Sequence, residues 1–325
     1  MNILFIGNFE APHSTENDRA WSFNQLGHNV IAVQENWATV KDLDELTFHP
    51  KKDQKIDLVI YSHTHGWEIP ELHSYFKRCK ATGIPTASVH LDRWAWLERA
   101  NDVGKEATWA TEWQFMADAS PEAVDLYNGL GLKWSYLKPG VIARDCYMAE
   151  PDKKRFPHEI IFVGSKNYHP EYKFRPRLVQ WLQASFGDNF GHYGPDGIAV
   201  LRGGDLNIAL ATAKIVVGDS CFGGRPNYVS DRYYETRGRG GFLMHPHVEG
   251  HEMEGVGHYN ARDLNDLQNQ INFYLGHKID RERMRKEGFE WVKNHGTYTH
   301  RAHQMLTTIF GEQPPMEAYD AKRQD

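Results

Sequence analysis

The stretch "SDRYYETRGRGGFLMHP", residues 230–246, brings a carboxylate, several cations and a run of glycines into one short segment. Ser230 is a favourable N-cap, and the free N–H groups after it would face the preceding loop "CFGGRPNYV". Gly223 and Gly224 in that loop permit close approach of the backbone to a ligand, and a helix N-terminus favours an anion such as a diphosphate. The segment therefore predicts an anion-binding turn followed by a helix.

Glu235 lies five residues beyond Ser230, which is about 7.5 Å along a helix. That is close to the span from a diphosphate to the ribose hydroxyls of the same nucleotide. A carboxylate can accept hydrogen bonds from paired ribose hydroxyls, while Arg232, about one turn away, could pair with phosphate. The alternative is an ordinary exposed helix with solvated Arg–Glu pairs. "RGRGG" is not a dinucleotide fingerprint, because it follows a helix rather than a strand.

Composition narrows the class of protein. The chain has 325 residues, of which 40% are hydrophobic and 25% charged, and this fits a soluble globular protein with one large or two ordinary domains. The net charge of −6 argues against a protein held to DNA mainly by phosphate contacts, although a local basic groove is compatible with it.

Location and metal content also follow from the sequence. No apolar run approaches the ~20 residues of a membrane span, and "MNILFIGNF" lacks the basic start of a signal peptide. The histidines of "HPHVEGHEMEGVGH" (245–258) have no regular ligand spacing, and Pro246 and the glycines indicate a loop, so we expect no metal site. We expect a cytoplasmic protein with free thiols, because its three scattered cysteines suit a reducing compartment: Cys79, Cys146 and Cys221.

The first half alternates short apolar runs with amphipathic stretches. The apolar runs predict strands at 2–7, 29–34, 56–62, 84–90 and 107–111, and the amphipathic stretches predict helices near 15–26, 68–82 and 120–130. Thr15 with Asp18 resembles a capping box, and Gly27 ends that helix. Strands separated by helices imply a parallel sheet, whose ligands lie beyond the carboxyl ends of the strands.

The polar segment 143–159 contains two prolines and is the best linker candidate. The pattern then restarts, with strands at 160–165, 189–194, 214–219 and 241–244 and helices near 171–186, 204–213, 230–238, 263–275 and 279–294. We therefore expect an α/β protein with two lobes facing a central cleft. The lobes span 1–145 and 146–312, and 313–325 form a mobile tail.

Five segments between about 159 and 310 carry a family resemblance: "IFVGS", "KIVVGDS", "NYVSDRYYETRGRGGFLM", "GHYNARDLNDLQNQINFYL" and "KEGFEWVKNHGTYTHRAHQML". In this order they resemble the C-terminal lobe of GT-B glycosyltransferases, in the family 4 and spore-maturation-protein-like branch. The segment "GNFEAPHSTENDRAWSFNQLGHNVIAVQ" is similar to the opening of the partner lobe. The resemblance implies two Rossmann-like lobes and a nucleoside-diphosphate sugar, UDP- or GDP-linked, as co-substrate. It implies no permanently bound cofactor.

The resemblance places the ribose-binding glutamate of the family at Glu235. Many relatives have a second acidic residue eight positions earlier, and this chain has Asn227 there, which leaves the donor sugar open. Lys166 and Arg175 match an Arg/Lys pair that neutralises the diphosphate, and such fixed cations can stabilise a leaving group without a metal. The nucleotide base is expected beyond the next strand, near His192, Tyr193 and Gly194.

His90, at the end of the strand 84–90, matches a histidine that contacts the donor sugar in some relatives. An inverting enzyme would need a general base, and Asp92 or His13 could serve. A retaining enzyme, which the resemblance favours, could pass the proton to the departing phosphate oxygen.

The acceptor could be a glycan, a lipid-linked sugar, a protein side chain or a hydroxymethylated pyrimidine in DNA, because phage DNA-modifying glucosyltransferases can also have two GT-B lobes. For DNA, Trp94 with Arg93 and Arg99 could stack on or clamp a flipped base. Two other functions stay open. A nucleotide-sugar epimerase would use carboxylates such as Asp92 and Glu68, and a non-catalytic module would bind a nucleotide or polymer.

Overall fold

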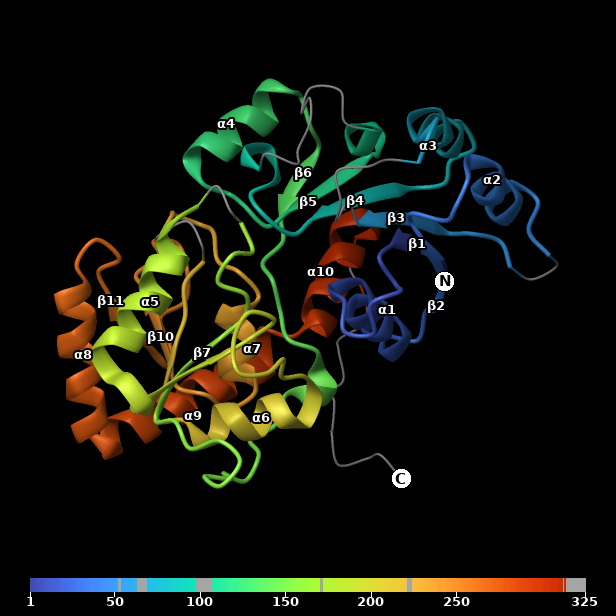
Figure 1. Ribbon diagram of the computed structural model, residues 1–325. Coiled ribbons are helices and arrows are strands. Elements are labelled where there is room, and N and C mark those ends of the chain that lie inside the picture. Colours follow the sequence, from blue (N-terminus) through green and yellow to red (C-terminus); the bar gives the residue numbers. More distant parts are fainter. Residues whose placement is uncertain are drawn as a thin grey trace. The chain divides into compact units, whose positions relative to one another are not determined.

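The computed structural model describes residues 1–51, 54–62, 69–97, 107–169, 172–220, 224–311 and 313. The chain divides into two compact units (Figure 1). Unit 1 comprises Met1–Lys138 with the last helix, α10 (Tyr298–Phe310), and unit 2 comprises Pro139–Thr297. Each unit is a parallel sheet with helices, so the expected α/β fold with two Rossmann-like lobes is confirmed.

Unit 1 has a six-stranded sheet in the order β2-β1-β3-β4-β5-β6. Its strands are β1 (Asn2–Gly7), β2 (Asn29–Gln34), β3 (Leu58–Ser62), β4 (Thr86–His90), β5 (Trp113–Met116) and β6 (Trp134–Tyr136). The connecting helices are α1 (Thr15–Gln25), α2 (Val40–Phe48), α3 (Leu72–Ala81) and α4 (Pro121–Gly129). Alternate residues face opposite clusters, Phe5 and Ile60 on one side and Leu4 and Val59 on the other, so both faces of the sheet are covered.

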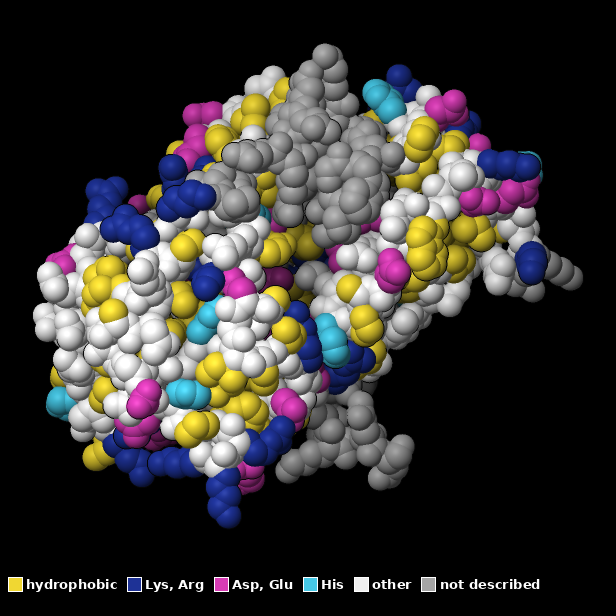
Figure 2. Space-filling view, viewed as in Figure 1, with side chains coloured by type: hydrophobic (Ala, Val, Ile, Leu, Met, Phe, Trp, Pro, Cys, Tyr) yellow, Lys and Arg dark blue, Asp and Glu magenta, His cyan; other side chains and the backbone are white. Residues whose placement is uncertain are grey.

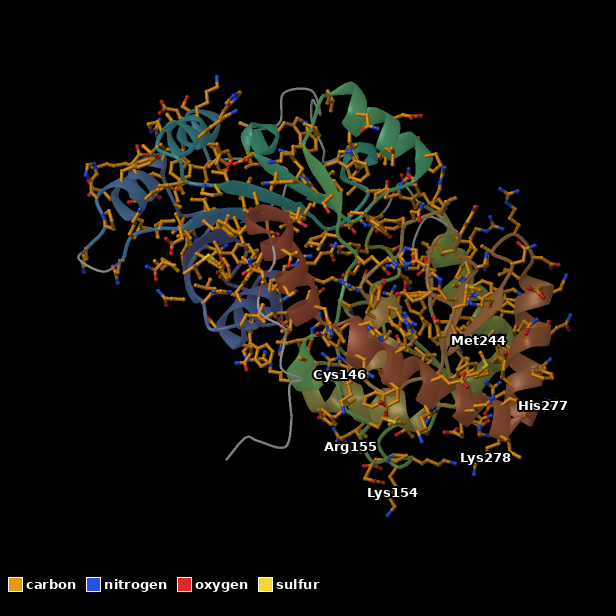
Figure 3. All side chains as sticks on the ribbon, turned by 180° about the vertical axis from the view of Figure 1, so that it is seen from behind. Cys146, Lys154, Arg155, Met244, His277 and Lys278 are labelled. Carbon is orange, nitrogen blue, oxygen red and sulfur yellow. The ribbon has the colours of Figure 1, made fainter. Side chains whose placement is uncertain are left out.

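Unit 2 has a five-stranded sheet in the order β11-β10-β9-β7-β8. The strands are β7 (Ile160–Val163), β8 (Phe190–Tyr193), β9 (Ile215–Val217), β10 (Leu243–Pro246) and β11 (Val256–Tyr259). The helices are α5 (Phe174–Phe186), α6 (Gly203–Thr212), α7 (Arg232–Gly238), α8 (Leu264–Gly276) and α9 (Lys278–His295). Met244 of β10 is fully buried in the sheet (Figure 3) with Phe162 and Val217, against α5 and α8.

Two expectations for unit 1 are wrong in detail. Ser14 Oγ accepts a hydrogen bond from the Asn17 amide at 3.1 Å, so Ser14 is the N-cap of α1 and no capping box starts at Thr15. The expected strand at 107–111 is a 3₁₀ turn, Ala107–Ala110, and the fifth strand is β5. The Thr111 hydroxyl donates to the Trp113 carbonyl at 3.1 Å, and this local bond turns the chain before the strand begins.

Four elements of the structure were not predicted: α2, β6, β11 and α10. β11 lies within the segment 245–258 that was expected to be a loop, and its His258 pairs in register with His245 of β10. α10 packs against α1 (Figure 1), where Met305 and Leu306 join the core of unit 1. This division differs from the expected lobe limits at 145 and 312, and the expected tail is described only at residue 313.

Two further properties bear on the site. No helix in the described ranges is long and apolar enough to cross a bilayer. Cys79 and Cys146 are buried thiols without a disulfide, and burial raises their pKa values to about 11 and about 12, so neither is a ready nucleophile. Cys221 lies outside the described residues.

Candidate functional site

The arginines expected to bind a diphosphate meet at the carboxyl ends of β7 and β9. Arg175, on the first turn of α5, donates from Nε to Asp219 Oδ1 at 2.8 Å and from Nη1 to the Ser165 carbonyl at 3.1 Å. Arg232 of α7 donates from Nε to the Val163 carbonyl at 2.7 Å and from Nη1 to the Asp219 carbonyl at 3.2 Å. The structure therefore brings Arg175 and Arg232 together, around Asp219.

Asp219 was missed in the sequence analysis. It follows β9 directly, its side chain is fully buried, and its Oδ1 is 3.6 Å from Arg232 Nη1 as well. The ring of Phe162 lies beneath both guanidinium groups, at 5.8 Å from Arg175 and 4.9 Å from Arg232. Two guanidinium groups and one carboxylate leave a net positive charge at the strand ends. An aspartate at the carboxyl end of a buried parallel strand was the available signal.

Gly164 makes the position of Arg232 attainable. Its φ is +130°, and a Cβ added there would lie 2.1 Å from Arg232 Nη2. Its amide donates to the Tyr193 carbonyl at 2.7 Å, which joins the ends of β7 and β8. Any residue larger than glycine would strain the backbone and displace the guanidinium.

Lys166 contributes the second predicted cation on the loop after β7. Its amide donates to both carboxylate oxygens of Asp196, at 3.2 Å each, and these bonds hold the loop after β7 in place. The Lys166 ammonium has no hydrogen-bond or ion-pair partner within the described part of the chain. The two arginines are held by protein groups, whereas the Lys166 ammonium is not, so it can turn toward an incoming anion.

The segment expected near the nucleotide base divides between the two faces of β8. His192 Nε2 lies 2.8 Å from the Gly164 carbonyl, and Gly194 packs against the same carbonyl, so both lie beside the end of β7. The Tyr193 hydroxyl is 3.0 Å from His158 Nδ1, on the opposite face. Because successive strand residues alternate, the Tyr193 side chain lies on the opposite face beside Phe156, and only its backbone lies beside the end of β7.

α7 begins later than expected. Its N-cap is Asp231, whereas the Ser230 hydroxyl donates to the Asp219 carbonyl at 3.4 Å, so the N-cap expected at Ser230 is wrong. Asn227 and Gly224 have φ values of +52° and +80°, and these left-handed residues shape the loop before the helix. Gly223 lies outside the described residues.

Glu235 shares one face of α7 with Arg232, three residues earlier. Its Oε2 accepts from Arg239 Nε, and its Oε1 has no hydrogen-bond partner in the described residues. The Glu235 side chain is 22% exposed, so this second oxygen can meet a ligand. Its partner Arg239 is buried and was not predicted.

Arg237 explains why a third arginine stands in this helix. It is fully buried on another face of α7, 4.3 Å over the Tyr233 ring, and it donates to the Tyr233 carbonyl at 2.9 Å and the Glu254 carbonyl at 3.0 Å. It therefore fastens α7 to the loop before β11. Burial raises the pKa of the Tyr233 hydroxyl to about 12, so Tyr233 stays neutral.

The three candidates in unit 1 follow strand ends, as expected. His90 ends β4, is 1% exposed, and stacks on Trp109 at 4.9 Å. Asp92 is half-buried two residues later, and His13 is exposed in the loop after β1. β3 separates β1 from β4, so those strands are about 10 Å apart and His13 lies away from the other two. A buried carboxylate, Glu16, was missed at this edge and accepts from the Ser62 hydroxyl at 2.6 Å.

Arg93 cannot clamp a flipped base in this structure. Its side chain is 2% exposed and donates to Asp118 at 2.8 Å and Glu122 at 2.9 Å, with the Trp96 ring 4.7 Å away. Arg93 fixes the loop after β4, so in this structure its side chain is not placed to contact DNA. The Trp94 side chain, Arg99 and Glu68 lie outside what the structure describes.

The histidine-rich segment forms parts of two strands. His245 Nε2 is 2.9 Å from the Ser220 hydroxyl, and burial lowers the pKa of His245 to about 3. Burial and the neighbouring His247 lower the pKa of His258 to about 4. No cluster of three metal-ligating side chains occurs among the described residues. A cavity of about 420 Å³ opens beyond β10 and β11, lined in part by His247 and Arg262.

Comparison with known proteins gives one family match and several structural matches. Residues 175–307 match the sequence model of a family described as glycosyl transferase-like. None of the curated proteins matches the chain. Solved structures match over nearly the whole chain.

Three of these structures illustrate the likeness. HepE from Anabaena, in complex with UDP-glucose, has a TM-score of 0.64 at 11% identity, over 95% of this chain and 99% of that one. Sucrose-phosphate synthase from Thermosynechococcus elongatus has a TM-score of 0.59 at 11% identity, over 94% of this chain and 97% of that one. A UDP-forming α,α-trehalose-phosphate synthase from Burkholderia xenovorans has a TM-score of 0.57 at 9% identity, over 95% of this chain and 98% of that one.

The two parallel-sheet lobes and these likenesses define the fold as that of GT-B glycosyltransferases. The family-model match, residues 175–307, covers most of unit 2 and extends into α10.

Proposed function

We propose that this protein is a glycosyltransferase that moves a hexosyl or pentosyl group from a UDP- or GDP-linked sugar to a hydroxyl acceptor. The observation that carries the proposal is the cationic group at the ends of β7 and β9, with Glu235 one helical turn from Arg232. The UDP-glucose complex of HepE and the UDP-forming synthase support a nucleotide-sugar donor.

Each part of the donor has a proposed partner in unit 2. Lys166 and Arg232 bind the diphosphate, and Arg175 supports Arg232 through their shared contact with Asp219. Glu235 Oε1 accepts hydrogen bonds from the ribose hydroxyls. The base lies beside His192 and Gly194, and the donor sugar reaches the Asn227 loop.

In the reaction, the acceptor oxygen forms a bond to the anomeric carbon of the sugar, and the bond from that carbon to the diphosphate oxygen breaks. The nucleoside diphosphate leaves with both electrons, and the nearby cations stabilise its charge without a metal. We propose a retaining outcome, in which the departing phosphate oxygen takes the acceptor proton. Asp92 or His13 would take that proton in an inverting enzyme, and His90 would contact the donor sugar.

A panel of UDP-, GDP- and CDP-sugars tests the proposal through the nucleotide released with and without acceptors. Acceptor-dependent release, unchanged by EDTA, is expected. Sugar isomerisation without release would instead indicate the epimerase, for which Asp92 is the described candidate. Binding of the nucleotide sugar without transfer or isomerisation would indicate a non-catalytic binding module. NMR of the product anomer distinguishes retention from inversion.

The ribose role is tested by Glu235→Ala. We expect nucleotide affinity to fall roughly tenfold or more, since a hydrogen bond to a charged group contributes about 1.5–3 kcal/mol. Glu287→Ala is the matched control, because Glu287 also pairs with an arginine four residues away but lies exposed on α9. Equal affinity of Glu235→Ala and the control in calorimetry would contradict the role.

For the acceptor we propose a glycan, with hydroxymethylated pyrimidine in DNA as the second candidate. Burial of Arg93 removes one contact that favoured DNA, and the face shown in Figure 2 carries both basic and acidic side chains. Transfer to hydroxymethylated but not to unmodified DNA would select the second candidate. Membership in the family 4 and spore-maturation-protein-like branch is part of the proposal.

A further inference from the structure

We infer that Arg239 is the positioning residue for Glu235, and that it sets how strongly the enzyme prefers a ribonucleotide over its 2′-deoxy counterpart. The inference rests on the proposed function, because it requires Glu235 to accept hydrogen bonds from the ribose. Arg239 would not touch the donor itself.

Arg239 is anchored independently of Glu235. Its side chain is 6% exposed, and it donates from Nη2 to Asp145 Oδ2 at 2.8 Å and from Nη1 to Asn207 Oδ1 at 2.6 Å. Asn207 in turn donates to the carbonyls of Asp145, at 2.8 Å, and Tyr147, at 2.9 Å. The guanidinium is therefore fixed to α6 and to the 3₁₀ turn Ala143–Asp145, next to Cys146 (Figure 3).

This anchored group holds the carboxylate of Glu235 in one orientation. The donors of a guanidinium point in fixed directions, so an acceptor bound at Nε loses its rotational freedom. With Oε2 held by Arg239, Oε1 is left to the ligand. Glu235 lies between Arg232, in the proposed phosphate site, and Arg239, the residue that follows α7. Both arginines are held by contacts outside the helix, so the position of Glu235 Oε1 is fixed between them.

An exposed pair shows the contrast. Arg283 and Glu287 on α9 have the same four-residue spacing as Glu235 and Arg239, in the opposite order, but their side chains are 56% and 47% exposed. Exposed pairs of this kind contribute little to structure or stability. The pair therefore supplies a control for the loss of an Arg–Glu contact.

The experiment measures affinities for UDP, GDP, 2′-deoxy-UDP and 2′-deoxy-GDP by calorimetry in the full chain. We expect the wild type to prefer the ribonucleotide by roughly tenfold or more, which is the loss of one hydrogen bond to a charged group. Arg239→Met should reduce this ratio to near one, as Glu235→Ala does, and the double variant should lower it no further. Arg283→Met should leave the ratio unchanged.

The outcomes separate the two ideas. If the wild type does not discriminate, or Glu235→Ala retains the discrimination, the ribose role in the proposed function fails. If Glu235→Ala abolishes discrimination and Arg239→Met keeps it, or weakens both nucleotides equally, the positioning role fails while the proposed function stands. Should Arg239→Met not fold, Arg239→Lys keeps the charge without the planar fork, and a ratio equal to that of the wild type would overturn the inference.

Discussion

At the scale of single residues, three arginines within one short helix do three different things. Arg232 reaches carbonyls at the strand ends, Arg239 holds a carboxylate, and Arg237 is buried among aromatic rings. The sequence shows three similar cations, and only their contacts separate them. Stability and ligand binding should therefore respond to different members of the set.

Arg237→Met should destabilise the protein by about 3 kcal/mol, because it removes a buried cation over Tyr233 and the side-chain hydrogen bonds to the carbonyls of Tyr233 and Glu254. Urea unfolding followed by circular dichroism measures the change. The exposed Arg283→Met should stay within about 0.5 kcal/mol of the wild type. Similar losses in the two variants would contradict the distinction.

His245 predicts a pH dependence of stability. Its pKa falls from the ordinary 6.5 to about 3 on folding because of burial. Between these values the unfolded chain binds the extra proton, so stability is complete above pH 6.5 and declines by about 1.4 kcal/mol per unit below it. His245→Gln should lower stability at pH 7 but lose roughly 2 kcal/mol less than the wild type between pH 7 and 5. Parallel pH profiles in urea unfolding would count against this.

At the scale of elements, the end of β7 controls the site through Gly164. Gly164→Ala should cost stability and also weaken UDP binding at least fivefold, because the new Cβ would displace Arg232, which lies 2.1 Å from its position. Gly131→Ala is the control, since Gly131 has a φ of +66° and open space around it. Both variants carry backbone strain, and only the first should change nucleotide affinity in calorimetry. Equal affinities would mean that Arg232 does not bind the donor.

The sequence predicts most strands of this fold because buried apolar runs bounded by polar turns are a strong local signal. It misses β11, whose glycines and histidines suggest a loop, since pairing with β10 is a long-range contact. Local signals also predict Ser230 as the N-cap of α7. In the structure the Ser230 hydroxyl donates to the Asp219 carbonyl instead, and the N-cap is Asp231. Asp219 and Arg239 are missed because the groups that anchor their side chains, Arg175 for Asp219 and Asp145 for Arg239, lie far away in the sequence.

At the scale of the whole molecule, the C-terminal helix belongs to the unit that begins the chain. α10 buries Ala302, Met305 and Leu306 in the core of unit 1, next to Phe23 of α1. Local patterning cannot reveal this, because the partners lie at opposite ends of the sequence. The lobe limits expected from the linker composition therefore separate residues that fold together.

Truncation should expose this arrangement. Ending the chain at residue 297 removes the buried side chains of α10 from unit 1. Two of them, Met305 and Leu306, contribute about 1.5–3 kcal/mol each, so unit 1 should unfold first on heating while unit 2 keeps its transition. Ending the chain at residue 311 keeps α10 and should leave both transitions in place. Calorimetry together with limited proteolysis follows the unfolding of each unit. If α1 resists protease in the 297 truncation as well as it does in the intact chain, α10 does not complete unit 1. UDP binding should survive in the 297 truncation, since the proposed contacts to the nucleotide all lie in unit 2.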